Sequence, residues 1–207
     1  MRIILASQSP RRRQLMEEAG IRFEVMVCET DERLSPEEEA DPVAAAQALA
    51  DKKAGAVVQM LLANPQAISE PTMVIGADTM VVCGGRIFGK PHSASEAKGM
   101  LRKMSGVTHQ VVTGVAVWGV QLDAQGKAQL AHRTISQTSQ VTFKPLTDEQ
   151  IDAYLREGES YDKAGAYAIQ GKGAALVESY EGAYDNIIGL PLQLMLETFP
   201  GIADERA

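Results

Sequence analysis

Cysteine is scarce in this sequence, with only Cys28 and Cys83 among 207 residues. The two are far apart and form no C-x-x-C pair, which excludes the common zinc and redox motifs built on that spacing. Both lie in apolar, strand-like runs. We therefore expect two buried free thiols rather than a disulfide.

Long apolar runs are also missing. The N-terminal stretch MRIILASQSP is too short for a signal peptide, and no segment approaches the roughly 20 residues that a membrane span needs. We therefore predict a cytoplasmic protein without membrane contact. Basic residues are outnumbered too, because 20 Lys and Arg face 27 Asp and Glu, a formal net charge of −7. That balance argues against a nucleic-acid polymer as partner, although a few cations could still hold a small anion.

The residues that are present predict a mixed α/β protein. Hydrophobic residues make up 45% and charged residues 23% of the chain, which is typical of globular proteins. The length suits one sizeable core or two lobes that share a sheet. Strands are expected at 2–6, 23–28, 73–82 (interrupted by GADT), 107–122, 128–143 and 174–180. Helices are expected at 10–20, 42–62, 93–105, 146–158 and 190–199. Because strands and helices do not alternate strictly, we expect a mixed sheet of two lobes.

Four helix starts carry recognisable capping signals. Ser9 before Pro10 and the pair Asp41-Pro42 combine a side-chain acceptor with proline at the first helical position. Ser93 to Glu96 forms a capping box, and Thr147 is a cap for the helix that follows it. Gly20 closes the first helix.

The stretch LASQSPRRRQL places three arginines at the start of the first helix. Cations are normally favoured at helix C-termini, so their position at the positive end of the dipole calls for an anion. Ser7, Ser9, Arg11 and Arg12 lie where the strand feeds this helix, and arginine offers paired donors that match phosphate oxygens. The alternative is that the arginines are solvated first-turn residues. No P-loop motif occurs anywhere in the chain.

A carboxylate ends the third predicted strand. Asp78, in VIGADTM, would be costly at a buried strand end unless it is paired or holds a metal, and magnesium uses carboxylates together with substrate phosphates. The alternative is a turn aspartate bonded to its own backbone. Asp31 and Glu32 follow the second strand and could share the metal. For Asp31, a solvated acidic loop is the favoured interpretation.

Other candidates are single polar residues near glycines. Lys90 is held between glycine and proline in FGKPH, whereas Lys53 lies on the Ala-rich helix. His109 has no second histidine at metal-ligand spacing, so a structural or hydrogen-bonding role is favoured. Gln170 follows a glycine-rich stretch and offers an amide that could pair with a nucleobase edge.

Taken together, six motifs resemble the Maf family of nucleotide pyrophosphatases, an inosine-triphosphatase-like group whose older name is septum formation protein. They are LASQSPRR, GADT, GKP, SG..H.V.TG, DKAGAYAIQG and NIIGLP. They occur in the family's order and span roughly residues 3–197. The main departure is a longer linker at 63–72, which touches none of the motifs. The resemblance implies a single domain over residues 1–207, with an elongated mixed sheet flanked by helices and a cleft between two lobes.

The resemblance also implies an enzyme, a hydrolase of acid anhydrides. It would convert a nucleoside triphosphate to the monophosphate and pyrophosphate with a divalent cation, Mg²⁺ or Mn²⁺, as a homodimer. DKAGAYAIQG is similar to the branch acting on dTTP and UTP, a house-cleaning activity with a possible link to cell division. By this likeness Asp78 is the catalytic acid and metal ligand, with Glu32 as a further acidic residue. The specificity positions are Arg12, Thr79 and Gln170. The phosphate-side positions are Ser7, Arg11, Lys53 and Lys90.

Two alternatives remain open: a pyrophosphatase for 7-methyl-GTP or other modified purines, and a non-catalytic nucleotide-binding regulator. Whether Asp78 takes a proton from water or only holds the metal is also open. All enzymatic versions require that cations from the front of the chain and the acid from its middle meet at one cleft. Arg12 and Asp78 on opposite sides of the molecule would exclude them.

Overall fold

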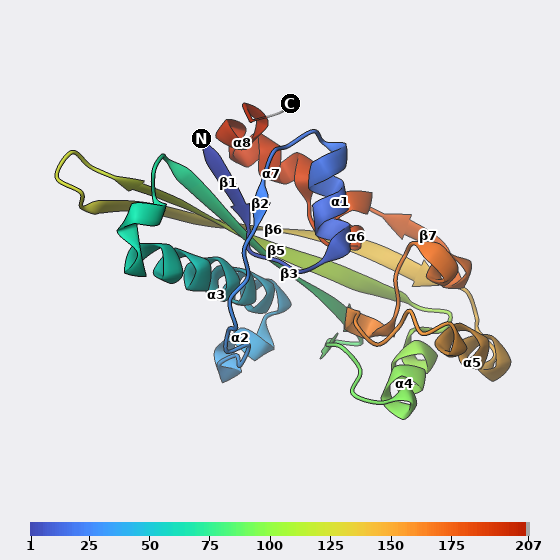
Figure 1. Ribbon diagram of the computed structural model, residues 1–207. Coiled ribbons are helices and arrows are strands. Elements are labelled where there is room, and N and C mark those ends of the chain that lie inside the picture. The colour runs from blue at the N-terminus through green and yellow to red at the C-terminus, as the bar shows by residue number, and fades with distance from the viewer. Residues whose placement is uncertain (206–207) are drawn as a thin grey trace.

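The computed structural model describes residues 1–205, and the strands of this part form one sheet (Figure 1). The strands are β1 (Arg2–Leu5), β2 (Glu24–Val25), β3 (Thr72–Cys83), β4 (Arg86–Phe88), β5 (Thr108–Leu122), β6 (Ala128–Phe143) and β7 (Val177–Glu181). The α-helices are α1 (Pro10–Glu18), α2 (Pro36–Ala40), α3 (Pro42–Ala63), α4 (Ala94–Met104), α5 (Asp148–Arg156), α6 (Tyr184–Ile188), α7 (Leu192–Thr198) and α8 (Pro200–Ala203). Short 3₁₀ helices cover Pro65–Ala67, Ala164–Ala166 and Gly171–Leu176.

The strand order is β2-β1-β3-β5-β6-β7, with β4 also paired to β3. β1 runs parallel to β2 and β3, and the other pairs are antiparallel, so the predicted mixed α/β class is confirmed. β3 is continuous through GADT, and the expected interruption there is wrong. Residues 76–79 pair with residues 113–116 of β5, so the small residues of this motif belong to the strand.

Helices cover both faces of the sheet (Figure 1). Because side chains alternate along a strand, even-numbered and odd-numbered residues of β3 enter different cores. Val74 packs with Ala50 and Ala54 of α3, whereas Ile75 packs with Met16 of α1 and Met195 of α7. The two faces of β3 are therefore covered by different elements.

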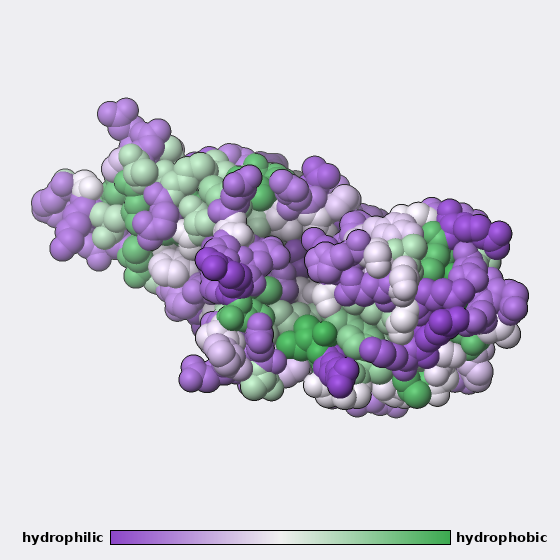
Figure 2. Space-filling model, turned by 90° about the horizontal axis from the view of Figure 1, so that it is seen from below, coloured by the Kyte–Doolittle hydropathy of each residue, from purple (hydrophilic) through white to green (hydrophobic). Residues whose placement is uncertain are grey.

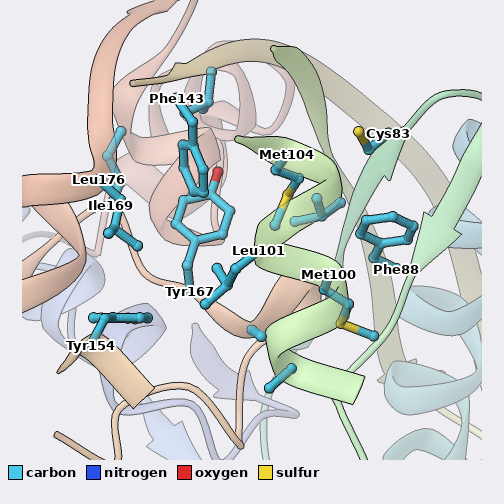
Figure 3. Packing of buried hydrophobic residues seen from close by; sticks show 14 of the residues in the cluster. Cys83, Phe88, Met100, Leu101, Met104, Phe143, Tyr154, Tyr167, Ile169 and Leu176 are labelled. Atoms are coloured by element: carbon cyan, nitrogen blue, oxygen red, sulfur yellow. The ribbon is translucent and has the colours of Figure 1, made fainter. Parts of the chain in front are cut away.

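A further core lies toward the other end of the long strands, where α4 and α5 pack. It contains Leu101, Phe143, Tyr154 and Tyr167 together with Val81 of β3 (Figure 3). Figure 2, seen from below, shows a recess near the middle of the molecule, between the part that holds α3 and the part that holds α4 and α5. β3, β5 and β6 contribute residues to the cores at both ends.

The predicted helix starts are confirmed, but the capping hydrogen bonds differ from the prediction at two of them. Pro10 begins α1, but the Ser9 side chain makes no capping hydrogen bond; its backbone N–H donates to Ser7 Oγ instead. Ser93 Oγ accepts from the Glu96 N–H as expected, whereas the Glu96 carboxylate accepts from His92 rather than from Ser93.

The caps at Asp41 and Thr147 are confirmed, the latter as a full capping box with Gln150. Gly20 follows α1 with φ +71°, as expected of a glycine that ends a helix. The acidic segment before α3 contains the short helix α2, which begins behind its own capping box of Ser35 and Glu38.

Three further expectations need correction. Only Glu24–Val25 of the second predicted strand pairs with β1, so β2 is short. Residues 174–176 end a 3₁₀ helix rather than begin β7. Both cysteines are free, but Cys28 is only partly buried, with its Sγ 3.8 Å from Met60 Sδ, whereas Cys83 is buried. None of the described helices has the length and apolar composition needed to cross a membrane.

Candidate functional site

The site lies where one edge of β3 is left open. β5 pairs with β3 over residues 72–82 and so occupies one edge along almost its whole length. On the other edge β1 pairs with residues 72–75 of β3, and the pairing with β4 begins only at Val81 of β3. Within residues 1–205 no strand pairs with residues 76–80 on this second edge. Asp78 and Thr79 are at the middle of the open stretch.

On the α3 face of the open stretch, the predicted acids and one lysine form an ion-pair cluster. Lys53 of α3 places its Nζ 2.5 Å from Asp78 Oδ1 and 3.0 Å from Glu32 Oε1. The Asp78 side chain is 15% exposed, the Lys53 side chain 20% and the Glu32 side chain 56%. One ammonium therefore bridges two carboxylates beside the open stretch, and one of the two negative charges is left uncompensated.

Two glycines bring α3 close enough for this contact. Gly114 of β5 lies directly opposite Asp78, and a Cβ added there would overlap the backbone of Ala46. A Cβ at Gly76 would overlap the backbone of Ala50 in the same way. The glycine of GADT and that of the TG motif thus let the helix carrying Lys53 lie directly on the sheet.

On the opposite face, Arg12 of α1 is held by three hydrogen bonds. Its Nε donates to the Gly189 carbonyl at 2.7 Å, one terminal nitrogen to Ser7 Oγ at 3.1 Å, and the other to Thr79 Oγ1 at 3.1 Å. A guanidinium has five N–H groups, so one on each terminal nitrogen remains for a ligand. Such a pair suits bidentate contact with an anion.

Ser7 reinforces this arrangement. Its buried Oγ accepts from the Ser9 N–H at 3.2 Å and from Arg12, so its own proton is available to a ligand. Burial lowers the pKa of the Arg12 guanidinium from its ordinary value. The negative charges of Asp78 and Glu32 oppose that shift, and the positive charge of Arg11 adds to it. The acids on the α3 face therefore act electrostatically on Arg12 across the gap.

The structure places the predicted cations from the front of the chain and the predicted acid on two different faces of β3. Asp78 and Thr79 are consecutive and point to opposite faces of β3, so Lys53 and Arg12 approach from different sides of the sheet. Both sets nevertheless border the same open edge, because Arg12 bonds to the residue next to Asp78. Arg12 and Asp78 are thus on opposite faces of the sheet but beside the same open stretch of β3, where a ligand at the strand edge could reach both.

Three other predicted residues lie farther out. Arg11 and Gln170 line one cavity of about 190 Å³ between α1 and α6, together with Tyr184 and Asp185. Burial lowers the pKa of Arg11, an effect that the nearby Asp162 opposes. Lys90 is exposed after β4, in a loop tied to the glycine-rich segment by a hydrogen bond from the Gly165 N–H to the Gly89 carbonyl.

Sequence reasoning missed three buried polar residues that are linked to Arg12 by successive hydrogen bonds through Thr79: Thr113, Asn186 and Ser139. Thr113 and Asn186 belong to the TG and NIIGLP motifs, which was the available signal, but the sequence does not show that the two residues are in contact.

For Asp31, the favoured interpretation of an acid in a solvated loop is confirmed, because Asp31 pairs with exposed Arg33 outside the open stretch. His109 is structural, buried against Tyr167 with its Nε2 2.7 Å from the tyrosine oxygen.

The donor set can hold a divalent cation only with help from a ligand. Over residues 1–205 no group of three or more His, Cys, Asp or Glu side chains is placed to bind a metal. Asp78 and Glu32 do converge on one cation, the Lys53 ammonium, so two carboxylates are available. Two carboxylates fit Mg²⁺, which commonly completes its shell with water and substrate phosphates.

Comparison with known proteins gives consistent results. The family model described as Maf-like protein matches residues 2–201. A dTTP/UTP pyrophosphatase of Citrifermentans bemidjiense is 46% identical over 190 residues, covering 92% of this chain and 90% of the relative. One of Pelotomaculum thermopropionicum is 44% identical over 190 residues, covering 92% and 91%. One of Bacillus velezensis is 43% identical over 195 residues, covering 92% and 91%.

A solved structure of a nucleoside-triphosphatase (dITP/XTP pyrophosphatase) from Mycobacterium abscessus covers 98% of this chain and 95% of its own. It has 12% identity and a TM-score of 0.38, at which level the likeness carries no argument. The match to the Maf model does carry one, because it extends over almost the whole sequence and includes every motif described above. This chain belongs to the Maf family.

Proposed function

We propose that this protein is a nucleoside triphosphate pyrophosphatase that hydrolyses dTTP and UTP to the monophosphate and pyrophosphate. The observation that carries the proposal is the open stretch of β3, where Arg12 and Ser7 on one face and Asp78 with Lys53 on the other border a single gap. The choice of nucleotide is supported by the names of the Maf relatives that are 43–46% identical to this chain.

In this proposal the cations bind and orient the polyphosphate. Arg12 offers its two remaining terminal N–H groups, and Ser7 offers its hydroxyl proton at the start of α1. Lys53 is the most adaptable donor, because its flexible stem allows it to leave a carboxylate for a phosphate oxygen. Arg11 and Lys90 add positive charge at either side. Phosphoryl transfer depends mainly on such positioning and charge neutralisation.

Asp78 and Glu32 are the residues that would hold the divalent cation, Mg²⁺ or Mn²⁺, together with the phosphates of the substrate. When bound, such an ion neutralises developing charge and makes an attacking water more acidic. Asp78 would fix that water beside the α-phosphorus. Thr79 and Gln170, with Arg12, would select the base.

The decisive experiment is a pyrophosphate-release screen over natural and modified nucleoside triphosphates with Mg²⁺ or Mn²⁺. We expect release from dTTP and UTP with MgCl₂, and none after chelation with EDTA. Release from purine triphosphates alone would instead support the modified-purine alternative. Tight nucleotide binding without turnover would support a regulatory protein. That alternative is disfavoured because Asp78 and Glu32 would repel an anionic ligand that is only bound.

We further propose a cytoplasmic homodimer without a nucleic-acid partner. The location is supported by two free cysteines, as is usual in reducing compartments, and the solution state by the family resemblance. Light scattering on the purified protein measures the mass directly. A value near 22.3 kDa, the mass of one chain, would contradict the dimer.

A further inference from the structure

A chain of hydrogen bonds leads from Arg12 into the interior of the protein. Thr79 Oγ1, which accepts from Arg12, is 3.0 Å from Thr113 Oγ1, and Thr113 Oγ1 is 3.0 Å from the Asn186 carbonyl oxygen. Thr79 and Thr113 are directly opposite each other in the β3–β5 register and share a face of the sheet. Thr113 is fully buried, so its hydroxyl is not reached by solvent.

The direction of every bond in this chain follows from counting protons. Arg12 can only donate, and a backbone carbonyl can only accept. The single proton of Thr113 therefore goes to Asn186, and its oxygen accepts from Thr79. The proton of Thr79 is thereby directed inward, and its outer lone pairs face Arg12.

Asn186, at the inner end of this series of hydrogen bonds, is itself held in place by further hydrogen bonds. Asn186 is fully buried, and its Nδ2 donates to the Val111 carbonyl at 3.1 Å and to Ser139 Oγ at 2.9 Å. Ser139 in turn donates to the Ala183 carbonyl at 3.0 Å. Asn186 therefore fixes α6 against β5 and β6. Because Thr113 donates to the fixed Asn186 carbonyl, its own oxygen is held in place as the acceptor for the Thr79 hydroxyl.

We propose that Thr113 is a positioning residue that sets the orientation of Arg12 by fixing the hydroxyl of Thr79. This rests on the proposed function, in which Arg12 binds the triphosphate. Without the Thr113 hydroxyl, the Thr79 proton turns to the Gly189 carbonyl, 3.4 Å away, which already accepts from Arg12 Nε. The lone pairs of Thr79 Oγ1 then turn away from the terminal nitrogen of Arg12, which weakens one of its three hydrogen bonds, and its two free N–H groups lose their fixed direction.

Binding of inorganic tripolyphosphate, measured by calorimetry, tests this without requiring turnover. For Thr113→Val, which keeps the shape but removes the hydroxyl, we expect the Kd to rise about tenfold, as for the loss of one hydrogen bond. Thr113→Ser keeps the hydroxyl and should bind within about twofold of the native protein, as expected when no hydrogen bond is lost. In turnover assays the same loss should appear in KM for dTTP with kcat nearly unchanged.

A matched control lies on the same strand. Thr108 of β5 makes a threonine–threonine hydrogen bond to Thr142 of β6 at 2.8 Å, at an exposed position outside the site. Thr108→Val should leave the Kd unchanged. The double variant Thr79→Val with Thr113→Val should bind no more weakly than Thr79→Val alone, because Thr113 acts only through Thr79. A purely structural role would give additive losses.

The outcomes separate the two proposals. The native protein could bind tripolyphosphate while Thr113→Val folds and binds it with the same Kd. That result would overturn the role of Thr113 and leave the proposed function intact. Native protein that neither binds tripolyphosphate nor releases pyrophosphate overturns both. If Thr113→Val does not fold, Thr113→Ala replaces it. Alanine also lacks the hydroxyl, so a folded Thr113→Ala with an unchanged Kd would again overturn the inference.

Discussion

The two faces of β3 hold their charged residues in opposite ways. On the α3 face, Lys53, Asp78 and Glu32 interact with one another as ions, and Glu32 is more than half exposed. On the other face, Arg12 is fixed by neutral acceptors, which are themselves fixed by buried hydroxyl and amide groups. The first set can exchange partners when a charged ligand arrives, whereas the second is already oriented before binding. In the proposed function, the rigid side would orient the polyphosphate and the adaptable side would adjust to its charge.

Removing the acid of the adaptable side should have the largest effect. For Asp78→Asn we expect kcat for dTTP to fall by about a thousandfold while the protein stays folded, because a carboxylate can hold a cation and its water and an amide cannot. Steady-state pyrophosphate release measures this. Asp31→Asn, an acid on the same stretch of chain as Glu32 that pairs with exposed Arg33, should retain native turnover. Near-native activity of Asp78→Asn would rule out its assigned role.

Separating α3 from the sheet should have the next largest effect. Gly114→Ala places a methyl group against the backbone of Ala46, so we expect a loss of about 3 kcal/mol in the free energy of unfolding. Lys53 should also move away from Asp78. Urea denaturation measures the loss. Gly119→Ala on the same strand is the control, because its Cβ would meet only Ala131, at ordinary distances of 3.7 Å from the Cβ and 3.9 Å from the carbonyl oxygen. Equal losses in both variants would contradict close packing of α3 as the cause.

Substitution of Arg12, on the rigid side, should mainly weaken substrate binding. Lysine at position 12 cannot keep three directed hydrogen bonds while offering two more to a ligand. For Arg12→Lys we expect KM for dTTP to rise about a hundredfold, as for the loss of bonds to a charged group. The matched substitution is Arg13→Lys, at an exposed neighbour on α1, which should leave KM unchanged. A fall in kcat with unchanged KM would assign Arg12 to the chemical step instead.

The smallest predicted effect concerns His109, which lies outside the candidate site, and is a change in the free energy of unfolding with pH. Burial lowers the pKa of this histidine from 6.5 to about 4. Between these values the unfolded chain binds a proton that the folded protein does not, so stability falls as pH falls through this range. From pH 7 to pH 5 we expect a loss of about 2 kcal/mol, one pKa unit being worth 1.36 kcal/mol. Urea titrations at both pH values measure it.

His109→Gln is the variant for this test, because it removes the titrating ring. Its free energy of unfolding should fall less between pH 7 and pH 5 than that of the native protein. If both proteins lose the same stability over this interval, the acid sensitivity belongs to other groups, and His109 is not its source.

Much of this arrangement could be predicted from local signals. Proline after a capping residue marked α1 and α3, and the arginines at the start of α1 pointed to an anion. The interruption expected at GADT was wrong. A glycine within a strand sequence usually indicates a turn, whereas Gly76 is required because α3 packs directly against the strand at this position. The sequence alone does not show that contact. Thr113 could not have been found. It meets Thr79 across 34 residues and Asn186 across 73, and only the strand register reveals the contact.

The open stretch of β3 is only residues 76–80, and β1 and β4 flank it at both ends. At about 3.3 Å per residue, it is roughly 16 Å long. Exposed strand edges invite a second polypeptide to add on, which leads to aggregation. Here an incoming strand would collide with β1 or β4 after a few residues. The short length of the open stretch therefore limits the self-association that a longer free edge would promote.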